Sequence, residues 1–239
     1  GGLIRIWNIV SQDEVFSVEF QEPAIDLDFK PDLPLVVVAI RPSEVQLWNI
    51  ETGTRVTSQH IFSFVVRPTF STTGDKLAII GSDHLNADND PVFDEISVWD
   101  YQLRTELVRW RATQDDEIIQ GAVFGPGDKM AVIDDQGTVS IWDLSDIRSP
   151  RPLGSPQIVH EGIVFDAIFS PNGACVGSVG FSDHSADILT DPDAEPVTLL
   201  GHKEKVVALA FLTPSPGLDS SLVPCGTDMV ATISADGMT

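Results

Sequence analysis

Gly137-Thr138-Val139-Ser140-Ile141-Trp142-Asp143 is the stretch that decides the fold: a turn glycine, an alternating apolar strand and a Trp-Asp pair. Similar stretches end in Trp7, Trp48 and Trp99, so four of the five tryptophans occupy one slot. Their spacings are 41, 51 and 43 residues. A nearly fixed period of this length is typical of a repeat protein, and the sequence therefore predicts tandem copies of one structural unit.

A second element recurs upstream of the later tryptophans. It is a strand ending in Phe, a tight turn rich in Gly, Asp and Asn, and an apolar strand, as in residues 70–80 and 124–133. Such turns supply the backbone angles that a hairpin needs. The preceding strand alternates, as in residues 25–29, which predicts one inward face. Each unit is therefore expected to hold one outer strand, two inner strands and the Trp strand, which together make one β-propeller blade.

The chain resembles the WD40-repeat family over essentially all of its 239 residues. The resemblance is carried by the Trp-Asp and Trp-Asn pairs, the Phe-Ser-Pro-Asn-Gly turn at 169–173 and the Gly-His pair that ends at His202. The repeats are degenerate, and one unit has Leu189-Thr190 where Trp-Asp would stand. The resemblance implies an all-β fold, a β-propeller of four-stranded antiparallel blades. The chain holds about five blade equivalents and is expected to belong to an array of seven or more, seven being usual in the family.

The repeats divide the whole of 1–239 into a WD40-type propeller region. Residues 1–9 could complete the last blade and close a five-bladed ring, which would remove the exposed edges. We favour a fragment of a larger ring, because both ends carry the turn glycine. The partial blade is 1–9, the complete units are 14–50, 54–100, 105–143 and 150–191, and the incomplete last unit is 196–239.

The chain is strongly acidic, with 36 Asp and Glu against 14 Lys and Arg and a net charge of −22. Nucleic acid is not expected as a partner, because binding phosphates requires clustered Lys and Arg. The dispersed acids fit either a solvating surface or a face that binds a basic partner.

No membrane contact is expected, because no run of about 18 apolar residues occurs.

Two cysteines, Cys175 and Cys225, fall at different points of their repeats. We expect them to be isolated small core residues rather than a disulfide or a metal pair. That expectation favours a reducing compartment. Since the chain also starts without a signal peptide, we expect an intracellular, cytoplasmic protein.

Two Ser-Asp-His triplets, at 82–84 and 182–184, contain the residue types of a hydrolytic triad. Adjacent strand positions point to opposite sides, whereas a triad needs convergent geometry. Within the WD40 family this region belongs to a structural hydrogen-bond network with a His and the Trp. The resemblance therefore implies a structural role for both triplets.

Three histidines stand where the family has its Gly-His dipeptide, and each is expected to pair with the Asp of a tight turn, which would lock the strands of a blade together. The clearest case is His202 with Asp236. No two histidines have the close spacing of a zinc site. The predicted structural network comprises His60, His160, His202, Asp236, Trp7, Trp48, Trp99 and Trp142.

Residues 86–90 place oxygen ligands at alternate positions, like the first half of a calcium loop. The match then fails, because Pro91 stands where Gly is required and Ser97 where a bidentate Glu is required. We therefore expect a solvated loop, with a weak cation site as the alternative.

No cofactor, metal site or catalytic residue is predicted, because no phosphate-binding loop or nucleophile motif occurs.

The leading functional hypothesis is a non-catalytic scaffold that binds other proteins, with Lys- or Arg-rich segments as the expected ligands. One alternative is a sensor or autoinhibitory module of a larger signalling NTPase. Another is an enzyme with an active site in the propeller channel, since one fold can host many functions. The loops expected to reach a partner are 41–44, 83–95, 134–136 and 183–187, with Arg41, Glu44, Asp83, His84, Asp88, Asp90, Asp134, Asp135, Asp183 and His184 as candidate contacts.

Overall fold

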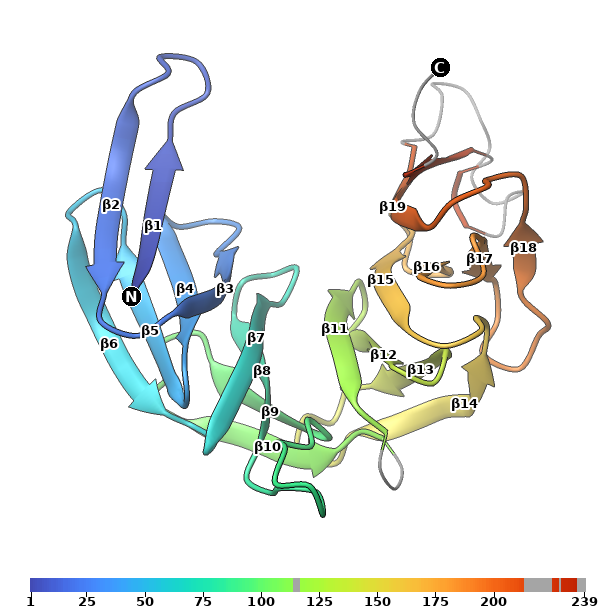
Figure 1. The fold of residues 1–239 in the computed structure, drawn as a ribbon, viewed down its shortest axis with the longest axis horizontal. Coiled ribbons are helices and arrows are strands. Elements are labelled where there is room, and N and C mark those ends of the chain that lie inside the picture. Colours follow the sequence, from blue (N-terminus) through green and yellow to red (C-terminus); the bar gives the residue numbers. More distant parts are fainter. Residues whose placement is uncertain (114–116, 213–224, 228, 236–239) are drawn as a thin grey trace. The chain divides into compact units, whose positions relative to one another are not determined.

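The computed structural model describes residues 1–113, 117–212, 225–227 and 229–235, and in these ranges all elements are β-strands (Figure 1). The described residues contain no helix of the length and apolarity needed to cross a membrane. The chain divides into two compact units, Gly1–Asp116 and Glu117–Thr239. Each unit is described by itself below.

Unit 1 contains one two-stranded sheet and two four-stranded sheets, all antiparallel. The sheets are β1 (Gly2–Trp7) and β2 (Glu14–Phe20); β3 (Ala24–Phe29), β4 (Leu35–Ile40), β5 (Glu44–Asn49) and β6 (Thr54–His60); and β7 (Phe64–Phe70), β8 (Lys76–Ser82), β9 (Glu95–Asp100) and β10 (Glu106–Arg111).

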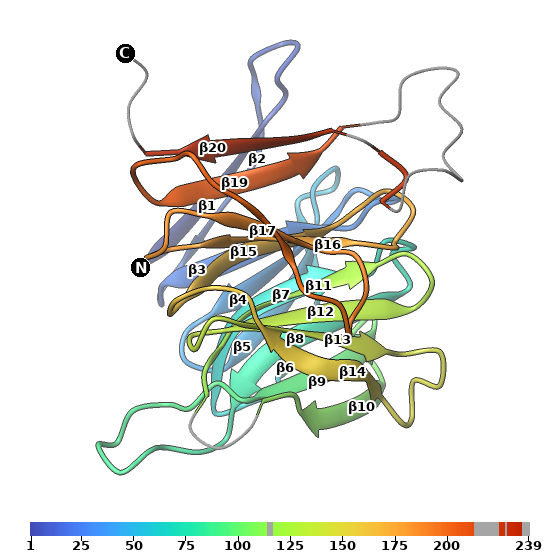
Figure 2. The same ribbon diagram turned by 90° about the vertical axis from the view of Figure 1, so that its right-hand side faces the viewer.

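Unit 2 contains two four-stranded sheets and one two-stranded sheet, again antiparallel, which lie as successive layers (Figure 2). The sheets are β11 (Ile119–Gly125), β12 (Lys129–Asp134), β13 (Thr138–Asp143) and β14 (Arg151–Ile158); β15 (Val164–Phe169), β16 (Val176–Gly180), β17 (Ala186–Leu189) and β18 (Val197–Leu199); and β19 (Val206–Phe211) and β20 (Val230–Ser234).

The sheets are displaced by one strand from the predicted units. Each outer strand was expected to open a unit, but it closes the preceding sheet and pairs with the Trp strand before it, as β6 pairs with β5. The physical reason is local: a turn of a few residues brings a strand directly beside its predecessor. A four-stranded sheet therefore covers residues 24–60 rather than 14–50.

The first strand of five sheets carries the same irregularity. In each, the register with the second strand shifts by one residue close to the start of the strand. The extra residue lies four positions before the Phe near the strand end, so it occurs at one place in the repeat. Such bulges bend a strand and redirect side chains. The extra residues are Ile25, Val66, Gln120, Phe165 and Val207.

The second strand of each four-stranded sheet is buried on both faces, which explains why it reads as a continuous apolar run. In β4, Val37 and Ala39 pack toward β7 and β8, whereas Val36 and Val38 pack toward β1 and β2. Neighbouring sheets therefore share a core through the second strand. The Trp strands β5, β9 and β13 share one burial pattern, because in each strand the second to fourth residues are buried.

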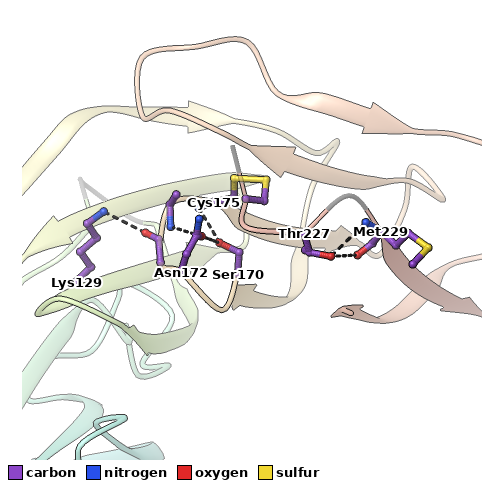
Figure 3. The surroundings of a disulfide bond; sticks show 9 residues. Lys129, Ser170, Asn172, Cys175, Thr227 and Met229 are labelled. Atoms are coloured by element: carbon purple, nitrogen blue, oxygen red, sulfur yellow. Dashed lines mark hydrogen bonds between the residues drawn. A yellow bond between two sulfur atoms is a disulfide. The ribbon is translucent and has the colours of Figure 1, made fainter. Parts of the chain in front are cut away.

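The two cysteines form a disulfide, so the prediction of isolated cysteines is wrong (Figure 3). Cys175 immediately precedes β16, and Cys225 belongs to the neighbouring sheet's connection; their Cα atoms lie 5.1 Å apart. Packing of adjacent sheets brings together two positions that are 50 residues apart in sequence. Because disulfides persist in oxidising environments, the argument for a reducing compartment no longer holds.

The fully buried Leu77 of β8 provides a test of the shared core. Leu77→Ala is expected to lower the free energy of unfolding by about 2–5 kcal/mol, because it removes buried methyl groups and leaves a cavity. Urea denaturation followed by tryptophan fluorescence measures this. Val56→Ala on the exposed face of β6 is the control, with a change within about 0.5 kcal/mol. Equal effects of the two substitutions would contradict the packing described.

The disulfide gives a second test. Cys225→Ser is expected to lower the free energy of unfolding by about 2–4 kcal/mol, because the bond restricts a long loop of the unfolded chain. Adding dithiothreitol should bring the unsubstituted protein to the stability of the variant and leave the variant unchanged. Two reactive thiols in the native, unreduced protein would show that the bond does not form.

Candidate functional site

Two of the four loops predicted to reach a partner border one cavity in unit 1. The β4–β5 turn contributes Arg41 and Pro42, and the long β8–β9 connection contributes Pro91 and Phe93. The start of β3 and residues 64–67 of β7 complete the wall. The cavity volume is about 610 Å³, which lies within the range of ligand sites in proteins.

Backbone hydrogen bonds hold the turn at this cavity in place. The Val65 N–H donates to the Pro42 carbonyl at 2.8 Å, and the Arg41 N–H donates to the Pro23 carbonyl at 3.0 Å. The bulge residues of β3 and β7, Ile25 and Val66, both line the cavity. The bulges therefore turn two apolar side chains toward it, a feature that the strand pattern alone did not predict.

The cavity carries three charged side chains, two arginines and one aspartate. Arg67 pairs with Asp26, with Nε to Oδ2 at 3.1 Å. The exposed Arg41 side chain makes no ion pair and no hydrogen bond within the described ranges of the chain. Arg41 is thus a cation that is available to a ligand.

Asp83 and Glu44, in contrast, are occupied within the protein. Asp83 accepts hydrogen bonds from the Ser63 N–H at 2.7 Å and from Arg109 at 2.9 Å. Partial burial opposes ionisation of Asp83, but these hydrogen bonds and the Arg109 charge hold its pKa below the usual range. Partial burial also opposes ionisation of Glu44, yet hydrogen bonds from Ser58 and Gln46 lower its pKa.

His84 lies close to two acidic residues, Asp94 and Glu95, at the start of β9. His84 Nε2 is 3.7 Å from Glu95 Oε1. Asn86 Oδ1 accepts the backbone N–H groups of Asp88 and Asp90, each at 2.9 Å, so this oxygen stabilises the loop itself. In the described part of the chain, no group of three or more His, Cys, Asp or Glu side chains could hold a metal ion.

In unit 2, Asp134 and Asp135 stabilise the turn that was predicted to reach a partner. Asp134 is buried, and its Oδ1 accepts the N–H groups of Gln136 at 2.9 Å and Thr138 at 2.8 Å. Burial raises the pKa of Asp134 despite these hydrogen bonds. Asp135 Oδ1 accepts the Ile118 N–H at 2.9 Å. Both carboxylates therefore serve the local fold.

The buried His160 is at the centre of a polar network in unit 2. Its Nδ1 lies 2.9 Å from Asp183 Oδ2 and its Nε2 lies 2.9 Å from Ser178 Oγ. Ser185 contacts the same imidazole at 3.3 Å and donates to Asp187 at 3.0 Å. The sequence triplet pointed to Asp183 but missed Ser178, Ser185 and Asp187, which come from two neighbouring strands and their turn.

This network has the residue types and contacts of a Ser-His-Asp triad. Ser178 is fully buried, however, and the adjacent cavity of about 320 Å³ is lined by His160, Asp183 and Ser185 but not by Ser178. A substrate carbonyl could not reach the Ser178 hydroxyl. We interpret the network as one that satisfies buried polar groups and fixes the β16–β17 hairpin. His184, next to Asp183, takes a left-handed backbone conformation with φ of 58°.

The other predicted histidines have different partners. His60 Nδ1 lies 2.9 Å from the hydroxyl of Ser43, in the β4–β5 turn, rather than from the Asp of a tight turn. His202 Nε2 lies 2.8 Å from the hydroxyl of Thr232 on β20. The predicted partner of His202, Asp236, is outside the described residues.

Three of the repeated tryptophans have matching surroundings. In each, the indole N–H donates to the side chain two residues earlier on the same strand: Trp48 to Gln46 at 2.8 Å, Trp99 to Ser97 at 2.7 Å and Trp142 to Ser140 at 3.1 Å. Trp7 differs, because Arg5 occupies the acceptor position and the indole is about half exposed. The shared arrangement supports a common structural unit for the three later repeats.

The His160 network provides a test with a defined pH dependence. Burial opposes ionisation of Asp183, but the His160 charge and the Glu161 and Ser185 N–H groups lower its pKa below the ordinary value of 3.8. A carboxylate whose pKa is lowered by folding contributes its full stabilisation at pH values above its unfolded-state pKa. This stabilisation is lost as the pH falls through the folded-state pKa.

Asp183→Asn is therefore expected to lower the free energy of unfolding by about 1–3 kcal/mol at pH 7, and the difference should disappear in strong acid. Urea denaturation between pH 7 and pH 2 measures it, with Asp193→Asn, an exposed carboxylate in the same unit, as control. A stability difference that does not depend on pH would contradict the proposed charge interaction.

The chain is similar to apoptotic protease-activating factor 1 of Rattus norvegicus, with 24% identity over 185 residues. The match covers 74% of this chain and 14% of the relative, so the chain spans about one seventh of that protein's length. No family model matches the chain. The all-β fold with its repeated four-stranded antiparallel sheets is consistent with propeller blades, and the similarity is to one part of a much longer protein.

Proposed function

We propose that this chain is a WD40-type propeller segment that acts as a non-catalytic protein-interaction scaffold. The observation that carries the proposal is the unit 1 cavity, where two loops expected to reach a partner meet beside exposed and half-buried apolar side chains. A concave, mainly apolar site with a few polar groups suits a peptide segment of a partner.

The repeated sheets support the propeller part of the proposal. The recurrent bulge, the doubly buried second strands and the indole hydrogen bonds of Trp48, Trp99 and Trp142 all repeat with the period of the sequence. A propeller built from such units presents its connecting loops as a rigid surface. The full burial of Ser178 argues against a nucleophilic role for this hydroxyl.

A second candidate function is that of a sensor or autoinhibitory module in a larger signalling protein. It is favoured by the similarity to apoptotic protease-activating factor 1, whose name describes activation of a protease in apoptosis. In that case the same loop surface would bind an upstream ligand or another part of the full-length chain. A phosphate-binding Walker A motif in the full-length protein would support this function, and a full-length protein without one would argue against it.

Selection from a phage-displayed random dodecapeptide library tests the interaction function. Phe93→Ala is expected to reduce the affinity for the selected peptides at least about tenfold, because truncating an aromatic side chain at the centre of an interface removes much binding free energy. Isothermal titration calorimetry measures the affinities. Leu33→Ala, an exposed apolar residue at the opposite end of β4, is the matched control and should leave them unchanged. Peptides that bind both variants equally well would place recognition away from the cavity.

A further inference from the structure

We propose that the unit 1 cavity selects an acidic segment, in which a Glu or Asp flanked by large apolar residues places its carboxylate on Arg41. This inference rests on the proposed interaction function and deepens it by naming the ligand class. It reverses the expectation, based on net charge, that the partner is rich in Lys or Arg.

The local charge of the cavity has the opposite sign to that of the whole chain. The chain has a net charge of −22, whereas the cavity wall carries Arg41, Arg67 and Asp26 and so has one net positive charge. Asp26 is already paired with Arg67 at 3.1 Å. The remaining cation, Arg41, belongs to the turn that backbone hydrogen bonds fix to β7.

Three carboxylates in the segments that border the cavity have a cationic or hydroxyl partner within the protein. Arg109 binds Asp83 at 2.9 Å, Arg111 binds Asp94 at 2.9 Å, and Ser58 donates to Glu44. An incoming lysine would have to compete with these contacts, and inside the cavity it would meet two guanidinium groups. A basic ligand is therefore disfavoured at this site.

Arg41 offers the chemistry that a carboxylate requires. A guanidinium presents several N–H donors in one plane and can bind a carboxylate through two parallel hydrogen bonds. Beside it, Phe64, Phe93, Pro91, Ile25 and Val66 form a partly exposed apolar wall. Apolar side chains on either side of the acid would cover this wall and shield the ion pair from water, which strengthens it.

The test uses three pools of fluorescein-labelled hexapeptides that share the frame X-Φ-Z-Φ-X-X, where X is a mixture without charged residues and Φ is Leu, Ile or Phe. Z is Glu in one pool, Gln in the second and Lys in the third. Fluorescence anisotropy at 0.15 M NaCl is expected to show at least about tenfold tighter binding of the Glu pool than of the Gln pool, with the Lys pool weakest.

Charge reversal at Arg41 provides the decisive comparison. Arg41→Glu should remove the preference for the Glu pool and make the Lys pool the tightest. The control Arg104→Glu reverses an exposed arginine of the β9–β10 turn that has no ion pair in the described residues, and it should leave the order unchanged. A preference of the unsubstituted protein for the Lys pool, or an order unaffected by Arg41→Glu, would overturn the inference.

The outcomes also separate this inference from the proposed function. If the three pools bind equally and Phe93→Ala abolishes their binding, the cavity binds peptides and the carboxylate preference is wrong. If no pool binds, or if binding does not respond to Phe93→Ala, both the carboxylate preference and the cavity's role in recognition are wrong.

Discussion

Burial of the second strand of each sheet on both faces is the constraint on which the rest of the structure depends. Val37 and Ala39 of β4 belong to the core shared with the β7–β10 sheet, while Val36 and Val38 belong to the core shared with β1 and β2. No single four-stranded sheet could cover both faces of its own second strand. Each sheet within a unit therefore requires its neighbour, which is the energetic basis of a repeat array.

The β6–β7 and β9–β10 connections contribute Ile61, Phe62 and Leu103 to the core, whereas the β4–β5 and β12–β13 turns consist mainly of polar or exposed residues. Their conformations are fixed by local hydrogen bonds, such as those that Asp134 accepts and those between β7 and the β4–β5 turn. The side chains of these turns can then differ between repeats without loss of the fold. In unit 1 the difference produces a cavity with an available arginine, and in unit 2 it produces the buried His160 network.

The net charge of the chain is a poor guide to the local charge at the candidate site. The chain is strongly acidic, but several carboxylates near the candidate site are held by arginines, hydroxyls or backbone N–H groups. Such partners lower the pKa of Asp83 and Glu44 and occupy some of their carboxylate oxygens. A ligand at the proposed site would meet the remaining local charge, to which Arg41 contributes most directly.

The sequence by itself determined the strands and their repetition. Residues 35–40, 44–49 and 95–100 were recognisable as apolar or Trp strands because alternation, turn residues and period are all local properties. The exposure of Arg41, Pro42 and residues 83–90 at strand ends followed from the same pattern, whereas Asp94 in the predicted loop 83–95 is buried. Similarity over 74% of the chain adds a 24% identical relative of much greater length.

Only the tertiary structure decided which strands share a sheet, where the bulges lie and which side chains meet. The Cys175–Cys225 disulfide and the Ser178 and Asp187 contacts around His160 join positions from different strands or sheets. The cavity of unit 1 likewise combines four separate segments. Such contacts depend on packing between elements that are distant in sequence. A local pattern of residue types cannot predict that packing.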